Sequence, residues 1–163
     1  MSIWGLFKGK PEPLVIYDAL GTFTLEHPQK DSFYEGEIQW PGGEAMVDLE
    51  IDGGGSMTAD AARRHLHSIA AESAVWDKRI REYAAGDMAG SDGNIEIWED
   101  DGSGGGSSLT KEAFIRRISI GFIRIQADGT IFFYYDLDGM FTDHGLGVYA
   151  DVSGDISSSE ICG

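Results

Sequence analysis

The dipeptide Asp128-Gly129 constrains the fold most, because it stands between two runs of β-branched and aromatic residues within residues 117–136. A two-residue Asp-Gly loop supplies the positive φ angles of a type I′ turn, and the twist of that turn matches the twist of the flanking strands. The pattern therefore predicts a β-hairpin whose turn is Asp128-Gly129.

The predicted turn also fixes the register of the hairpin. Counting outward from the turn, the expected cross-strand pairs are Ala127 with Thr130, Ile125 with Phe132, Arg124 with Phe133, Ile123 with Tyr134, and Phe122 with Tyr135. Apolar side chains then pair on both faces of the hairpin. A hairpin that is apolar on both faces is expected in the middle of a sheet and not at its edge.

An antiparallel meander is predicted ahead of this hairpin. Residues 14–17 and 21–25 are two short strand-like runs separated by a turn. Residues 33–40 alternate in polarity, which directs three side chains into the core: Tyr34, Ile38 and Trp40. After Pro41-Gly42-Gly43, residues 44–51 alternate again, with acids pointing outward and four apolar residues inward: Ala45, Val47, Leu49 and Ile51.

A helical period replaces the strand period after Gly53-Gly54-Gly55. Ser56 or Thr58 is expected to cap the helix, with Asp60 in its first turn. Residues 58–85 then form either one long helix or two short helices that meet near Glu72-Ser73. The stripe that should pack on the sheet consists of Ala62, Leu66, Ile69, Ser73, Trp76, Ile80 and Tyr83.

The rest of the chain adds smaller elements. A short buried element is expected at Ile95, Ile97 and Trp98, and the acidic, Gly- and Ser-rich residues 99–108 are expected to form a flexible loop. Thr110 should cap a short helix through Phe114. Residues 145–152 should form the final strand, with Leu146, Val148 and Ala150 on one side.

These elements predict an α+β fold in which helices pack on one face of an antiparallel sheet of about six or seven strands. At 163 residues the chain suits one domain, which we place at residues 14–153. Residues 1–13 are expected to form a flexible N-terminal tail, and residues 154–163 a frayed C-terminal tail.

Charge limits the possible partners. The formal net charge is -16, and no Lys or Arg follows Arg124. Such a field repels nucleic-acid phosphate and anionic membranes, so we expect neither as a partner. The negative charge serves either solubility or the attraction of a basic protein partner.

The lone Cys162 suits a reducing cytoplasm, and the apolar run within residues 1–10 is too short for a signal peptide or membrane span.

Candidate chemical motifs are weak. One candidate cation site follows a predicted strand and consists of Asp136, Asp138, Asp143 and His144. The spacing of these residues is more typical of a turn whose acids cap backbone amides.

His65 and His67 point to different sides of a helix and cannot share a metal. Glu35 and Glu37 lie on one outward strand face, which indicates solvated acids instead of a glycosidase pair. We therefore predict no catalytic residue, no metal and no cofactor.

Several segments together resemble a bacterial family known only as a domain of unknown function. The resemblance covers most of residues 14–155 and depends on the order of segments 20–25, 34–38, 76–85, 109–114, 118–120, 128–130 and 138–141, followed by His144. Similar sequences have a Trp-Gly pair before this histidine, whereas this chain has Thr142-Asp143. The resemblance implies the same order of strands, helices and C-terminal hairpin, and no established activity.

By analogy with small acidic bacterial proteins, the resemblance also suggests an immunity protein that neutralises a basic toxin. We expect non-catalytic protein binding; the alternatives are a small hydrolase of unknown substrate and a structural or regulatory binding module. The acids expected to contact the partner are Glu35, Glu37, Glu44, Asp48, Glu96, Glu99, Asp100, Asp101, Asp136, Asp138 and Asp143.

Overall fold

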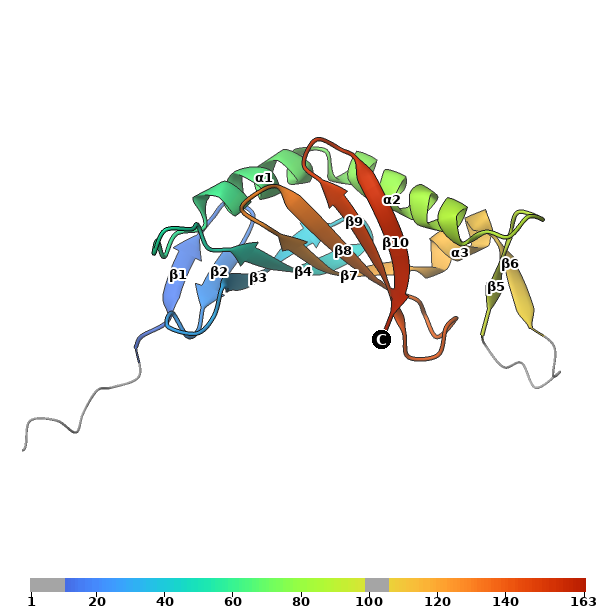
Figure 1. The fold of residues 1–163 in the computed structure, drawn as a ribbon, viewed down its shortest axis with the longest axis horizontal. Helices are drawn as coiled ribbons and strands as arrows, with labels where there is room; N and C mark the ends of the chain where they lie inside the picture. The colour runs from blue at the N-terminus through green and yellow to red at the C-terminus, as the bar shows by residue number, and fades with distance from the viewer. Residues whose placement is uncertain (1–10, 99–105) are drawn as a thin grey trace, which may run out of the picture.

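The computed structural model describes residues 11–98 and 106–163. Its main element is an eight-stranded sheet with the order β1-β2-β3-β4-β7-β8-β9-β10, and helices cover one face of it (Figure 1). The strands of this sheet are β1 (Leu14–Tyr17), β2 (Thr22–Leu25), β3 (Phe33–Trp40), β4 (Gly43–Glu50), β7 (Ser119–Ile125), β8 (Thr130–Asp136), β9 (Gly145–Asp151) and β10 (Ile156–Cys162). The fold is therefore α+β, as predicted, with one or two more strands than expected.

The predicted N-terminal meander is confirmed. Strands β1 to β4 pair antiparallel in sequence order, and the residues predicted to point inward are buried, except that Ile51 lies just after β4 and is half-buried. The next neighbour, β7, pairs with β4 in parallel. A parallel neighbour needs a crossover connection, which here contains all three helices. The sheet is therefore mixed and not purely antiparallel.

The central hairpin is confirmed, but its predicted turn and register are wrong. Ile125 pairs with Ile131 and Ile123 with Phe133, so each partner is shifted by one residue. The loop has three residues, because the Gln126 N–H donates to Thr130 O at 2.9 Å and the Gly129 N–H to Gln126 O at 3.1 Å.

The reason lies in the backbone of the loop. Gly129 has a φ of 93°, whereas Asp128 is not in the left-handed region that a type I′ turn requires. Asp128 instead accepts a hydrogen bond from the Thr130 N–H at 2.8 Å. This is the three-residue alternative, a type I turn followed by a left-handed glycine. Its register places four inward residues on one buried face: Ile123, Ile125, Ile131 and Phe133.

The helical segment consists of two helices, α1 (Asp60–Ala71) and α2 (Ser73–Met88), joined at Glu72. Of the two predicted alternatives, two short helices is therefore the correct one.

The predicted caps are wrong, because neither Ser56 nor Thr58 caps α1. The carboxylate of Asp52 accepts from the Asp60 N–H at 2.7 Å and from the Ala61 N–H at 3.0 Å. An acid from the preceding loop thus satisfies two of the free amides at the helix start.

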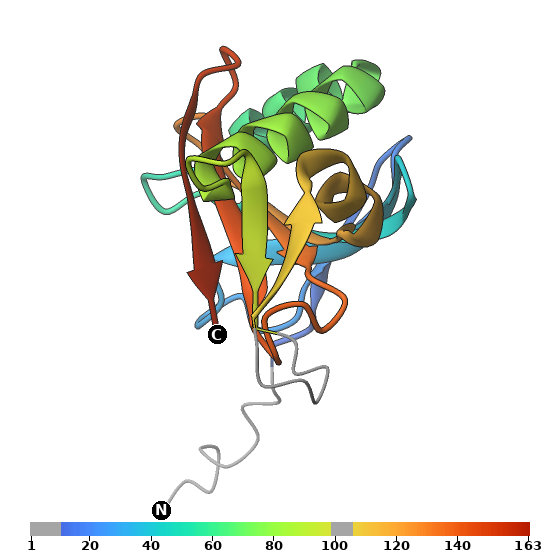
Figure 2. The same cartoon turned by 90° about the vertical axis from the view of Figure 1, so that its right-hand side faces the viewer.

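A smaller unit lies at one end of the sheet, where β5 (Asn94–Ile97) and β6 (Ser107–Thr110) form a separate hairpin next to α3 (Lys111–Arg117) (Figure 2). The predicted cap of α3 is confirmed, since the Thr110 hydroxyl oxygen accepts from the Ala113 N–H. Ile95 and Ile97 are buried as expected, whereas Trp98 is 55% exposed. Of the predicted loop at residues 99–108, residues 99–105 lie outside the described part, and 107–108 belong to β6.

The predicted C-terminal tail is wrong, because residues 156–162 form strand β10 on β9. The run Ile-Ser-Ser-Ser-Glu-Ile-Cys has little apolar content, so its strand pattern is weak. Its two ends, Ile156 and Ile161, pack against the core, and the Ser159 hydroxyl donates to the Asp87 carboxylate of α2 at 2.6 Å. The edge strand is thus anchored by tertiary contacts that have no local signature.

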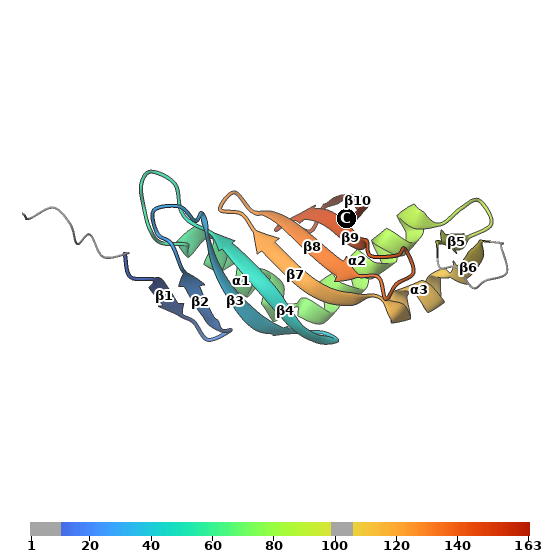
Figure 3. The ribbon, with the colours of Figure 1, turned by 90° about the horizontal axis from the view of Figure 1, so that it is seen from below.

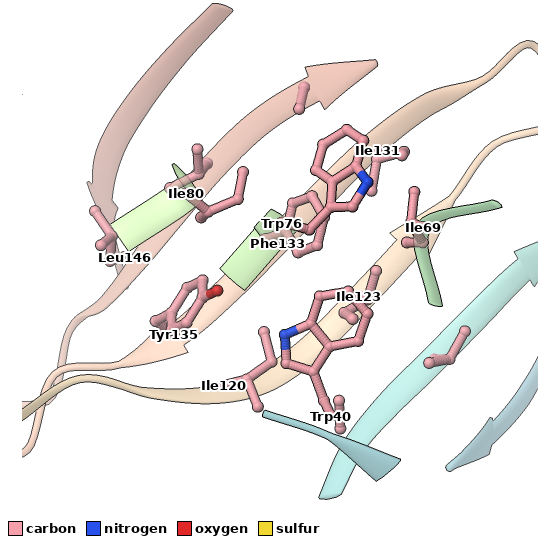
Figure 4. Close-up of a cluster of buried hydrophobic side chains, with 14 of the residues drawn as sticks. Trp40, Ile69, Trp76, Ile80, Ile120, Ile123, Ile131, Phe133, Tyr135 and Leu146 are labelled. Atoms are coloured by element: carbon pink, nitrogen blue, oxygen red, sulfur yellow. The ribbon is translucent and has the colours of Figure 1, made fainter. Parts of the chain in front are cut away.

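The core lies between α1, α2 and the covered face of the sheet. Trp76 from α2 stacks on Phe133 of β8 with a centroid separation of 6.0 Å (Figure 4). Trp40 of β3 lies at the same distance from the same ring, in a tilted geometry. Large aromatic rings therefore join helix and sheet, and they bury a large apolar area.

Replacing Gly129 by Ala should lower the free energy of unfolding by about 1–2 kcal/mol, because a Cβ is strained at positive φ. The added Cβ would also lie 3.0 Å from Val152 Cγ1. The matched control is Gly86→Ala, at an exposed position near the end of α2 with nothing within 4 Å of the new Cβ. The control should gain up to about 1 kcal/mol, since Ala favours helix over Gly. Urea denaturation of both variants checks this, and equal shifts of the two midpoints would contradict it.

Candidate functional site

The second face of the eight-stranded sheet has no described helix over it, and Figure 3 looks onto this open face. Its side chains are those that alternate with the core residues along each strand. We define the open face by the outward residues of the central strands: Phe33, Glu35, Glu37, Gln39, Glu44, Met46, Asp48, Glu50, Phe122, Arg124, Phe132, Tyr134 and Tyr149. This face combines an acidic half with an apolar half.

The acidic half lies on β3 and β4. Glu37 pairs across the strands with Met46, and Glu35 pairs with Asp48. Glu35, Glu37 and Glu44 are exposed, and Met46 is 50% exposed. A shallow hollow of about 460 Å³ lies here, lined by Thr22, Glu35, Gly36, Glu37 and Met46. Carboxylates thus surround an accessible apolar side chain.

The apolar half lies on β7, β8 and β9. The rings of Phe132 and Tyr149 are 4.9 Å apart, and those of Phe122 and Phe132 are 6.4 Å apart. A Cβ on Gly147 would lie 2.7 Å from the Phe132 ring, and one on Gly145 would lie 2.1 Å from the Tyr134 ring. The rings therefore rest directly on the glycine backbone of β9. The result is a flat apolar surface, not a set of projecting side chains.

Arg124 is the one cation on the described strands of this sheet. Its guanidinium donates to Asp48 Oδ2 from Nε at 3.1 Å and from a terminal nitrogen at 2.7 Å. It also lies 4.6 Å from the ring centroid of Phe33 and 5.2 Å from that of Phe122. Asp48, which was predicted to point outward into solvent, is only 8% exposed because Arg124 covers it. This pair neutralises the centre of the face, and none of the other acids of the face forms an ion pair with a described residue.

The other predicted contact acids do not join this surface. Asp136 accepts from the Asp138 N–H at 2.7 Å, and Asp138 pairs with Arg117 at 2.9 Å. Asp143 is exposed in the same turn, and Glu96 is exposed on the separate β5–β6 hairpin. Glu99, Asp100 and Asp101 lie outside the described residues. Of the predicted acids, the structure therefore brings together Glu35, Glu37, Glu44 and Asp48 on one face.

The turn after β8 is held by local hydrogen bonds. His144 Nδ1 lies 3.1 Å from Phe141 O and 3.0 Å from the Thr142 hydroxyl oxygen, and the His144 ring is edge-on to Trp98. His65 and His67 have separate partners, the carbonyl of Ala127 and the carboxylate of Asp18. Within residues 11–98 and 106–163, no group of three or more His, Cys, Asp or Glu side chains is arranged to hold a metal ion.

A buried polar cluster centred on Asp77 of α2 was missed by the sequence analysis. Asp77 is 8% exposed, and its Oδ1 accepts from Trp40 Nε1 at 3.2 Å and from the Tyr135 hydroxyl at 2.8 Å. Its Oδ2 accepts from Arg81 Nε at 2.7 Å. The spacing of Asp77 and Arg81, four residues apart on a helix, was the available signal.

This cluster has a structural role. Both carboxylate oxygens of Asp77 accept hydrogen bonds from core side chains, so the carboxylate serves as a shared buried acceptor. Burial, reinforced by the negative charge of Asp77, raises the pKa of Tyr135 far above its usual value and keeps the phenol protonated as a donor. Arg81 continues the network by donating to the carbonyls of Ile115 and Ile118 at the end of α3.

A second carboxylate cluster joins the β1–β2 turn to α1. The Asp18 side chain is 2% exposed and pairs with Arg63 at 2.8 Å and with His67 at 2.9 Å. Burial alone would raise the pKa of Asp18, but hydrogen bonds from the Leu20 N–H, Arg63 and His67 outweigh it and lower the pKa to about 2. Asp18 therefore remains charged throughout the physiological pH range and fastens the first hairpin to the helix layer.

A family model described as an uncharacterized protein conserved in bacteria (DUF2262) matches residues 17–161. Comparison with curated proteins and with solved structures gave no match. Across residues 11–98 and 106–163, the helices are all too short or too polar to cross a lipid bilayer.

Replacing Asp77 by Ala should lower the free energy of unfolding by about 3–5 kcal/mol, because Arg81 and two ring donors lose their buried acceptor. The control is Glu82→Ala on the same helix, whose exposed 3.8 Å pair with Lys78 should contribute under about 1 kcal/mol. Urea denaturation checks both. If the two variants lose the same stability, the Asp77 cluster does not hold the helices on the sheet.

Replacing Asp18 by Asn should lower stability at neutral pH by roughly 1–2 kcal/mol, allowing for the partial exposure of Arg63 and His67. Because the folded pKa of about 2 lies below the ordinary value of 3.8, this stabilisation is present above about pH 4 and is lost as the pH falls toward 2. Melting curves at pH 7, 5 and 3 check this. A difference between wild type and variant that does not shrink at pH 3 would contradict it.

Proposed function

The chain belongs to the bacterial family DUF2262, whose description gives no activity, and we propose that it is a non-catalytic binding domain for a basic protein. The observation that carries the proposal is the open face, where exposed carboxylates border a flat apolar surface and Asp48 neutralises Arg124. Aromatic residues and Met are enriched in protein interfaces, and they are placed here beside acids that can meet Lys and Arg of a partner.

The two halves of the open face would contribute different parts of the binding. Met46, Phe132, Tyr134 and Tyr149 offer an area that a partner could exclude from water. The surrounding acids mainly accelerate the encounter, because charge complementarity changes the association rate more than the final affinity. Affinity is therefore assigned to the apolar half and selection of a basic partner to the acidic half.

The first partner class to test is a basic bacterial toxin domain, for which this chain would be the immunity protein. A toxin that cleaves nucleic acid needs a cationic surface for phosphate, and a net charge of -16 attracts such a surface from a distance. We place the protein in the reducing cytoplasm, since its one cysteine, Cys162, is a free thiol.

An enzyme would instead require ionisable groups that converge on a cavity. The carboxylates of Asp18, Asp48 and Asp77 lie largely out of solvent in the described parts of the chain, and each is paired with an arginine. The three lie in separate structural clusters and do not converge on a cavity, so binding is the better-supported function.

The test is the association rate of a partner captured from the native host. Glu37→Lys should slow association, and the wild-type rate should fall steeply between 50 and 500 mM salt, as the Debye length shrinks from about 14 to about 4 Å. Dissociation should change far less. The matched control is Glu72→Lys, which makes the same charge change at an exposed position in the helix layer. An acidic partner, a rate that is insensitive to salt, or equal effects of the two variants would sink the proposal.

A further inference from the structure

Strand β10 forms one edge of the main sheet. It pairs with β9 on one side, and no described strand pairs with its other side (Figure 1). Its seven residues include no Pro and no Lys, the residues that commonly protect an edge from pairing with another chain. A bulge interrupts the register between Ile156 and Ser158, but residues 158–162 pair with β9 without a break. This edge therefore offers a regular stretch of backbone for another strand.

The opposite edge of the sheet differs. Strand β1 has only four residues and directly follows Pro11 and Pro13. A short edge next to prolines accepts an additional strand poorly, because proline lacks the backbone N–H. Of the two edges, β10 is the one suited to strand addition.

A hollow lies beside the start of β10, toward α2. Its volume is about 350 Å³, and it is lined by Arg79, Glu82, Tyr83, Gly154, Asp155 and Ile156. Tyr83 and Ile156 supply a half-buried apolar wall, and Glu82 and Asp155 supply exposed carboxylates. Arg79 is already engaged, since it donates to the carbonyl of Gly154 and lies against the Trp76 ring. Lys78 is 3.8 Å from Glu82, but both side chains are mostly exposed.

We propose that the outer edge of β10, together with the hollow at its start, binds an extended basic segment of the protein partner as a ninth strand. Main-chain hydrogen bonds along residues 158–162 supply affinity, and the hollow selects one side chain of the segment. A Lys or Arg stem packs on Tyr83 and Ile156 while its charged end reaches Glu82 and Asp155. The identity of the partner rests on the proposed function, whereas the addition of a strand to the β10 edge does not.

A second copy of this chain fits the edge less well. Each copy has a net charge of -16, and pairing β10 with β10 would bring two copies of Glu160 and Asp155 to one junction. A basic segment instead gains from these charges. The edge is also continuous with the open face, because Ser158 pairs with Tyr149 and Glu160 with Gly147. One partner can therefore occupy the open face and contribute a strand to the same sheet.

The experiment uses a nine-residue peptide of alternating Lys and Val with blocked ends, followed by NMR on the full chain. Saturable shifts are expected in residues 156–162 and around Tyr83. At ten times the dissociation constant, exchange of the amides that the peptide covers should slow by about tenfold. Glu82→Gln should weaken binding by about two- to fivefold, the effect of one partly exposed ion pair.

The control is the same peptide methylated on alternate amide nitrogens, in two versions. An added strand directs one alternate set of its N–H groups toward β10, so one version should bind and the other should not. If the two versions behave alike, strand addition is overturned. Peptide shifts confined to Glu35, Glu37 and Met46 would also overturn it while leaving the proposed function standing. Sedimentation of the chain alone as a dimer that the peptide does not dissociate would mean that a second copy fills the edge, which overturns the proposal as well.

Discussion

The carboxylate of Asp77 is the interaction on which the arrangement of layers depends. It connects α2 to Trp40 on β3 and to Tyr135 on β8, two strands that β4 and β7 separate in the sheet. Through Arg81 it also reaches the carbonyls at the end of α3. Polar groups in a low-dielectric interior are costly when unpaired, so few placements of α2 on the sheet satisfy all of these groups at once. Apolar contacts supply most of the attraction, and this cluster selects the orientation.

One-sided coverage gives the two faces of the sheet different roles. The covered face contains the large apolar side chains that pack on α1 and α2, and it determines the stability of the fold. The open face contributes less to stability, which leaves its residues available for recognition. Two glycines of β9 shape the open face. Because Gly145 and Gly147 have no side chains, the rings of Tyr134 and Phe132 can lie against the backbone of β9.

Local patterns predicted the features that depend on local periodicity. Alternation placed Tyr34, Ile38 and Trp40 inside and Glu35 and Glu37 outside, because neighbouring strand residues face opposite sides. Features made by distant partners were missed, including the Asp52 cap, strand β10 and the Asp77 cluster. The apolar half of the open face was missed for another reason. The central hairpin has apolar residues on both faces, and this correctly predicted its central position in the sheet. Periodicity cannot say, however, whether a helix covers the second face.

The parallel pairing of β4 with β7 divides the sheet into two meanders, β1–β4 and β7–β10. Each meander joins sequence neighbours, whereas the seam between them closes only after all three helices and the small hairpin have been made. During synthesis, the N-terminal meander therefore leaves the ribosome with the backbone edge of β4 unpaired, and this persists until β7 follows. An unpaired strand edge can pair with another chain, and the block of acids on β3 and β4 gives the incomplete sheet a negative charge that opposes such association.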